Sequence, residues 1–180
     1  LLNVSINLSG RQFYRDDIAQ RISDIVRGEG CEPSWIELEV TETSLLHDLD
    51  AIRKALHALR NEGFTVAIDD FGTGYSSLAY LHRFPVDILK IDSAFINRLN
   101  ETHRDFELVR NILQIGRSLR MATVAEGIET EEQRQMLCEL GCEFGQGFLF
   151  SRPVESVDAE TLLISKAPLP GFEDQMRRVD

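Results

Sequence analysis

Short apolar segments alternate with longer amphipathic segments along most of the chain, and this alternation restricts the possible folds more than any other feature. Runs rich in Val, Ile, Leu and Phe predict strands, and apolar residues at helical spacing predict the helices between them. The predicted strands are residues 3–8, 35–40, 65–68, 88–91, 122–125 and 144–150. The predicted helices are residues 12–27, 50–61, 105–119 and 131–140. Repeated strand–helix units predict parallel strands with right-handed crossovers, and therefore an α/β fold.

Two α/β architectures fit this alternation, an open doubly wound sheet and a closed (β/α) barrel. The strands end, at their carboxyl sides, in polar side chains. These are Asn7, Glu39, Glu42, Asp69, Asp70, Lys90, Asp92, Glu126, Glu129 and Gln146. In a barrel such strand ends converge on one mouth, whereas an open sheet spreads them along an edge. Convergence favours a TIM-like (β/α) barrel.

The number of predicted strands is smaller than a barrel needs. A TIM-like barrel has eight strands and about 250 residues, whereas this chain has 180 residues and six predicted strands. We expect residues 1–164 to form the C-terminal three-quarters of a barrel domain, with about six of its eight strands. The other strands could be deleted, disordered or supplied by a partner. Residues 165–180 are expected to form a tail or linker, because Pro168 and Pro170 interrupt them.

Charge and composition restrict the partners and the compartment. The net charge of −11 disfavours DNA or RNA as a partner, because non-specific affinity for nucleic acid comes from Lys and Arg on phosphates. Three cysteines cannot all pair within the chain, which fits a reducing cytoplasm. The sequence has neither a signal-peptide pattern nor the roughly 18 apolar residues of a membrane span. We therefore expect a cytoplasmic domain, whose longer parent could be anchored in a membrane.

The polar strand ends suggest a metal site. Ionised carboxylates raise one another's pKa when they cluster without counter-charge, and divalent cations relieve that repulsion. The expected metal ligands are Asn7, Glu39, Asp69, Asp70, Asp92 and Glu126. Such oxygen-rich sets suit Mg²⁺ or Mn²⁺. Lys90 could hold a phosphate or an attacking water, and two metals beside a lysine are suited to phosphodiester hydrolysis.

Structural roles are the alternatives for several of these residues. Asp70 could cap a helix or turn, and Lys90 could be an ion-pair partner. Glu42 and Glu129 could brace loops, and Gln146 could satisfy backbone groups. Six strands that all end in polar groups are nevertheless hard to explain without a site.

Seven short motifs, in their order along the chain, resemble those of the EAL domain family. They are NLS at residues 7–9, EVTE at 39–42, DDFGTGYSSL at 69–78, KID at 90–92, AEGIE at 125–129, QGF at 146–148 and FSRP at 150–153. The likeness runs from residue 3 to about residue 153. One such motif would be weak support, but several in matching order and spacing are specific.

This resemblance implies a bacterial phosphodiesterase that hydrolyses cyclic di-GMP to linear pGpG with two Mg²⁺ or Mn²⁺ ions. It supports the six metal ligands named above and places Asp69 between the two ions. Glu126 would be a metal ligand or general base, and Lys90 would contact the attacking water or the phosphate. Gln146 would hold water or substrate. Glu42 resembles a residue that steadies the loop after Asp70, and Glu129 a substrate-side or loop group.

The resemblance also implies partners. The loop at residues 71–77 and the helix after it are associated with dimerisation in this family, so a homodimer is expected. A dimer partner could then alter metal occupancy by shifting Asp70. Companion GGDEF cyclase or sensor domains could occur in a longer parent.

The main departure is that the Glu-Ala-Leu motif that names the family does not occur in these 180 residues. Its glutamate would be a further metal ligand, so we expect the isolated chain to turn over substrate negligibly. The alternative function is a catalytically inactive EAL domain that acts as a cyclic di-GMP receptor or protein-interaction module. An unrelated metal-dependent barrel enzyme acting on sugars or enolates is a more remote possibility.

Overall fold

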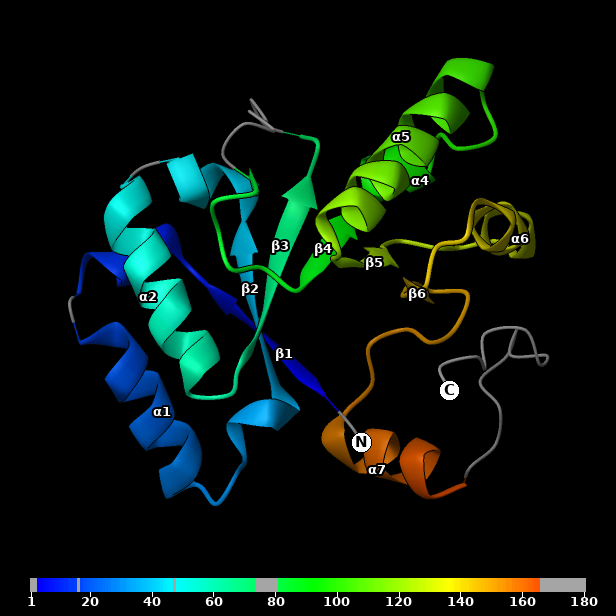
Figure 1. Cartoon of the computed structure of the whole chain (residues 1–180). Coiled ribbons are helices and arrows are strands. Elements are labelled where there is room, and N and C mark those ends of the chain that lie inside the picture. Colours follow the sequence, from blue (N-terminus) through cyan, green and yellow to red (C-terminus); the bar gives the residue numbers. More distant parts are fainter. Residues whose placement is uncertain (1–2, 16, 47, 74–80, 166–180) are drawn as a thin grey trace.

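Six parallel strands form one sheet in the computed structural model, which describes residues 3–15, 17–46, 48–73 and 81–165. The strands are β1 (Val4–Leu8), β2 (Ile36–Thr41), β3 (Thr65–Phe71), β4 (Ile88–Ile91), β5 (Ala122–Ala125) and β6 (Phe144–Gly145). They lie in the order β1-β2-β3-β4-β5-β6, and each pairs in parallel with the next. This sequential order is that of a barrel, because a doubly wound sheet reverses direction at a switch point. Within the described residues β6 does not pair with β1, so the sheet stays open there (Figure 1).

Helices connect the strands, as parallel pairing requires. The α-helices are α1 (Ile18–Gly28), α2 (Leu49–Asn61), α4 (Ser93–Ile96), α5 (His103–Leu119), α6 (Glu131–Leu140) and α7 (Ser156–Ser165). Three short 3₁₀ helices are η1 (Gly10–Tyr14), η2 (Pro33–Trp35) and η3 (Glu42–Leu46). Helices α1 and α2 lie side by side against the β1–β3 part of the sheet (Figure 1). The α/β fold predicted from the alternation is therefore confirmed.

The hydrophobic core lies between the helices and one face of the sheet. In β2, Leu38 and Val40 are fully buried, and the apolar faces of α2 and α5 contribute Leu56 and Leu113 to the same core. The alternate residues of β2, which include Glu39, point to the opposite face. Because successive side chains alternate, a strand whose apolar residues pack against helices turns its acids toward the sheet's other face.

Three predicted elements differ from those observed. Strand β3 extends to Phe71, three residues beyond the predicted end at residue 68. The last strand was predicted to span residues 144–150, but β6 ends at Gly145 because the chain turns back onto residue 128. The Ile128 N–H donates to the Gln146 carbonyl, and the Leu149 N–H donates to the Ile128 carbonyl. The helix predicted over residues 12–27 is divided into η1 and α1, because Arg15 has an extended backbone. The domain boundary at residue 164 remains a prediction, and the expected tail lies almost wholly outside the described residues.

Candidate metal and active site

The carboxyl ends of β1 to β5 meet at one edge of the sheet and bring polar side chains together. In the register of the sheet Asn7 is the partner of Glu39, and Thr41 is the partner of Asp69. Register partners of neighbouring parallel strands point to the same face. Glu39 is buried, with an exposed fraction of 6%, whereas Asn7 is exposed. The predicted convergence of strand ends is thus present for residues from the first five strands.

Lys90 on β4 lies at the centre of this edge and is almost fully buried. Its Nζ atom is 2.5 Å from Glu39 Oε1, 2.6 Å from Glu126 Oε1 and 3.6 Å from Asp69 Oδ1. Burial alone would lower the pKa of Lys90, but hydrogen bonds with Glu126 and Glu39 outweigh it and raise the pKa above its ordinary value. The side chain is therefore a fixed cation at neutral pH, and it acts as a donor rather than a base.

Asp69, Asp70 and Glu126 form an acidic cluster beside this lysine. One carboxylate oxygen from each lies within 4.8 Å of the others. Asp70 has a left-handed backbone, with φ of 54°, at an irregularity in the pairing of β3 and β4. Such a conformation is costly for a residue other than glycine, and it is typical of functional positions. Burial is the main reason that the pKa of Asp70 is raised, with repulsion from Asp69 and Asp92 adding to it.

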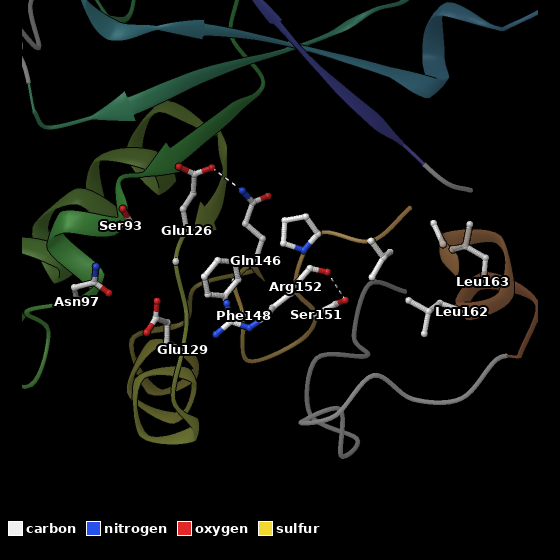
Figure 2. A pocket seen from close by; sticks show the side chains of 15 residues that line it. Ser93, Asn97, Glu126, Glu129, Gln146, Phe148, Ser151, Arg152, Leu162 and Leu163 are labelled. Carbon is white, nitrogen blue, oxygen red and sulfur yellow. Dashed lines mark hydrogen bonds between the residues drawn. The ribbon is translucent and has the colours of Figure 1, made fainter. Parts of the chain in front are cut away.

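Glu126 follows β5 and connects the acidic cluster to Gln146, the residue directly after β6. Burial raises its pKa, and Lys90 opposes that rise. Its Oε1 atom also accepts a hydrogen bond of 2.8 Å from Nε2 of Gln146 (Figure 2). Glu126 therefore shares one oxygen between two donors, and its other oxygen has no contact among those just described. This arrangement leaves Glu126 able to bind a further cation or to accept a proton.

Glu42 forms a hydrogen bond with the backbone just after the paired aspartates. Its Oε2 atom accepts a 2.9 Å hydrogen bond from the Gly72 N–H. Gly72 has φ of 96°, and an added Cβ would lie 2.9 Å from the Phe95 ring. Residues 74–80, which include the rest of the predicted dimerisation loop and the start of its helix, lie outside the described residues.

Glu129 lies apart from the acidic cluster. Its side chain is exposed and lines a groove of about 960 Å³ that also touches Glu126 and Gln146 (Figure 2). The groove lies between the ends of β5 and β6 and helix α7. Glu129 is therefore placed to contact a ligand in the groove rather than a metal ion within the cluster.

Several lining residues of this groove were missed in the sequence. The guanidinium of Arg152 lies over the ring of Phe148, 4.4 Å from its centre, and α7 contributes Leu162 and Leu163 (Figure 2). An apolar wall with one stacked cation is typical of pockets for planar or anionic ligands. Phe148 and Arg152 lie in the QGF and FSRP motifs, but nothing in the sequence indicated that they share a wall with α7.

The cluster fits a divalent cation. It offers only oxygen ligands, burial and then repulsion between its acids raise the pKa values of Asp70 and Glu126, and Lys90 is the only cation that the described residues place in ion-pair contact with it. Asp92 is close enough to affect Asp70, although its Oδ1 atom already accepts a 2.7 Å hydrogen bond from Ala94 N at the start of α4. Mg²⁺, Ca²⁺ and Mn²⁺ favour such carboxylate sites.

Among the described helices, none is both long enough and apolar enough to cross a membrane.

Sequence comparison identifies relatives along most of the chain. The sequence pattern of the EAL domain family matches residues 1–153. The chain is 44% identical over 165 residues to the Pseudomonas aeruginosa bifunctional diguanylate cyclase/cyclic di-GMP phosphodiesterase MucR, covering 92% of this chain and 24% of MucR. It is 40% identical over 162 residues to the cyclic di-GMP phosphodiesterase NbdA of the same organism, covering 90% of this chain and 21% of NbdA. The chain thus spans about a quarter or less of these relatives.

Solved structures show the same fold. The MucR phosphodiesterase in complex with c-di-GMP has a TM-score of 0.83 and 43% identity, over 87% of this chain and 64% of that one. Klebsiella pneumoniae BlrP1 in a manganese and c-di-GMP complex has a TM-score of 0.78 and 37% identity, over 84% of this chain and 39% of that one. The family match, the sequence identity and the shared fold agree, and the chain belongs to the EAL domain family.

Proposed function

We propose that this domain hydrolyses cyclic di-GMP to linear pGpG in a reaction that depends on two Mg²⁺ or Mn²⁺ ions. The observation that carries the proposal is the clustering of Asp69, Asp70 and Glu126, two of which also form ion pairs with the buried ammonium of Lys90. Crowded carboxylates with raised pKa values are unfavourable unless cations balance them. The residues that would hold the ions are Asn7, Glu39, Asp69, Asp70, Asp92 and Glu126.

The ions, when bound, would lower the pKa of a water molecule and stabilise negative charge on the phosphate oxygens. The chain's own residues orient the reactants. Lys90, which stays protonated, donates hydrogen bonds to the attacking water or to a phosphate oxygen in addition to its carboxylate partners. Gln146 donates its amide N–H to a water or substrate oxygen beside Glu126.

Glu126 accepts the proton that the attacking water loses. As the water oxygen forms a bond to phosphorus, the bond between phosphorus and the ribose 3′ oxygen breaks, and that oxygen takes a proton from solvent water to become the 3′ hydroxyl of the linear product. A general base works best when its pKa lies near the operating pH, and burial raises the pKa of Glu126 in that direction. The catalytic residues are therefore Asp69, Lys90 and Glu126.

The groove beside Glu126 gives room for one guanylate half of the substrate. Its volume of about 960 Å³ is at the upper end of ordinary ligand pockets. Glu129 can accept hydrogen bonds from ring or exocyclic N–H groups of a base, and Gln146 can contact its phosphate. Glu42 acts from outside, by holding the loop that carries Asp70.

The relatives support this assignment. MucR and NbdA carry cyclic di-GMP phosphodiesterase in their names, and BlrP1 was solved with c-di-GMP and either manganese or calcium. The choice of Mg²⁺ or Mn²⁺ for this chain follows from the oxygen ligands and is part of the proposal. So are its cytoplasmic location, its homodimerisation through the segment after Asp70, and a companion cyclase or sensor domain such as that implied by the name of MucR.

The proposal is tested by chromatography of the products formed from cyclic di-GMP in the presence of Mn²⁺. We expect linear pGpG from a protein in which a Glu-Ala-Leu strand precedes these residues, and no pGpG after Asp69→Asn. The matched control is Asp87→Asn, at the opposite end of the sheet, which should retain activity. Binding of cyclic di-GMP without turnover would favour the receptor function instead. The 180-residue chain alone should show negligible turnover.

A further inference from the structure

Gln133 is a buried polar residue that belongs to none of the motifs considered above. It lies in the first turn of α6, and its exposed fraction is 6%. Its Oε1 atom accepts hydrogen bonds from the Glu129 and Thr130 N–H groups, at 2.9 and 3.0 Å. Its Nε2 atom donates to the Ile96 carbonyl at 3.2 Å. One side chain therefore connects the loop after β5 with the end of α4, 37 residues earlier in the chain.

The two connected segments each carry a proposed metal ligand. The loop after β5 begins at Glu126, and α4 begins next to Asp92, whose carboxylate caps it. These segments also touch directly, because an added Cβ on Gly127 would lie 2.5 Å from Ser93 Cβ. The segments thus contact each other at Gly127, beside Glu126, and again at Gln133, beyond Glu129.

Helix α4 also contacts the loop of the paired aspartates, since the Phe95 ring leaves no room for a side chain on Gly72. The helix has only four residues and cannot hold its position by its own backbone hydrogen bonds. Its position depends on these neighbours. At its C-terminal end the Ile96 carbonyl accepts one hydrogen bond from the Leu99 N–H, within the same segment, and a second from Gln133, which comes from a remote one.

We propose that Gln133 is a positioning residue that sets the distance between the loop of Glu126 and the segment of Asp92 by binding both through one amide. The amide is required by its chemistry, because one end must accept from two N–H groups and the other must donate to a carbonyl. A glutamate of the same shape satisfies the first requirement but places a second acceptor against the Ile96 carbonyl. The effect of Gln133 on metal binding rests on the function proposed above.

The test compares Gln133→Glu and Gln133→Leu with the matched control Thr130→Ala. Thr130 Oγ1 accepts the backbone N–H of Gln133 in the same capping box, so its loss weakens the start of α6 but keeps the bond to Ile96. Hydrogen exchange of the folded, metal-free protein is the first readout. We expect faster exchange in both residues 93–99 and residues 127–130 for the Gln133 variants, and in the second segment alone for Thr130→Ala.

The second readout is Mn²⁺ binding without substrate. It is measured from the electron paramagnetic resonance signal of free Mn²⁺. Loss of groups that orient metal ligands costs about 10–100-fold in affinity. We expect Gln133→Glu to bind Mn²⁺ about 10-fold more weakly than the unsubstituted protein, and Thr130→Ala to bind it with an affinity within about two-fold of the unsubstituted protein. The proposal is overturned if the Gln133 variants leave exchange in residues 93–99 unchanged, or if they bind Mn²⁺ as Thr130→Ala does. If the unsubstituted protein binds no Mn²⁺, the proposed function fails, and the exchange data alone decide whether Gln133 positions α4.

Discussion

The two ends of the parallel sheet use the same residue types in opposite ways. At the amino ends of the strands, Asp87 accepts a 3.0 Å hydrogen bond from Val66 N–H and forms a 2.7 Å ion pair with Arg60. Glu143 likewise accepts a 2.7 Å hydrogen bond from Thr123 N–H. Each of these acids has its own donors and joins neighbouring parts of the chain.

At the carboxyl ends the acids outnumber the cations that the described residues place beside them. Glu39, Asp69 and Glu126 surround the single ammonium of Lys90, and Asp70 adds a fourth carboxylate beside them. An acid that is paired with its own donors stabilises the fold, whereas the acids that share one ammonium are those that we propose bind metal ions. In TIM-like barrels, stability is associated with the amino-terminal face and catalysis with the carboxyl-terminal face.

The largest effect is expected from Asp69→Asn. Loss of an outer partner of a metal ligand costs about 10–100-fold, and loss of a proposed metal ligand itself should cost more, on the order of 10³-fold in kcat/KM. Stability of the metal-free protein should stay the same or rise, because one of the repelling charges is removed. Parallel measurements of kcat/KM and of urea unfolding check both parts. A large loss of stability would mean that Asp69, like the acids at the amino ends of the strands, stabilises the fold.

Lys90→Met should weaken the fold itself. Removal of one partner from a buried ion pair costs about 3–5 kcal/mol, and here it leaves Glu39 and Glu126 facing each other. Urea unfolding of metal-free protein measures the loss. Added Mn²⁺ should restore part of the stability of the variant, because a cation takes the place of the ammonium. Restoration by Na⁺ at the same ionic strength would argue against a specific site.

Asp87→Ala should have the opposite signature to Asp69→Asn. It leaves the Val66 N–H without its acceptor, and a buried unpaired group costs about 1–3 kcal/mol. Specific activity of the folded protein should not change, because this end of the sheet is remote from the acidic cluster. Thermal unfolding and kcat/KM at saturating Mn²⁺ distinguish the two ends, and a fall in activity without a fall in stability would contradict the comparison.

The smallest effect is a pH dependence of stability. The pKa of Glu126 is raised above its ordinary value of 4.5, so the folded state holds this proton to higher pH than the unfolded state does. Stability from this group is therefore present below pH 4.5 and is lost as the pH rises toward the folded pKa. The difference in Tm between Glu126→Gln and the unsubstituted protein, both metal-free, should grow over that pH interval. Each kcal/mol of difference in the free energy of unfolding corresponds to about 2–4 °C. Saturating Mn²⁺ should abolish this trend, and an unchanged trend would count against a cation at Glu126.

Much of this arrangement was predictable, because local patterns report on it. Alternation of apolar and polar residues in β2 places Glu39 on the face opposite Leu38 and Val40, and the position of Asp69 and Asp70 after an apolar run indicated that they lie near a strand end. The four-residue helix α4 was not predicted, since so short a segment has no periodicity to detect. The role of Gln133 was also missed, because its partner Ile96 is 37 residues away.

The sequence by itself determined the alternation of strands and helices, the parallel sheet and the set of polar strand ends, because these depend on the local period of side chains and on chain connectivity. Only the tertiary structure decided that Lys90 lies between Glu39 and Glu126, that Asp70 takes a left-handed backbone, and that a groove beside Gln146 is walled by α7. Those features depend on which segments, remote in sequence, come close in space. Burial and charge repulsion are set by these distances, which local sequence patterns do not report.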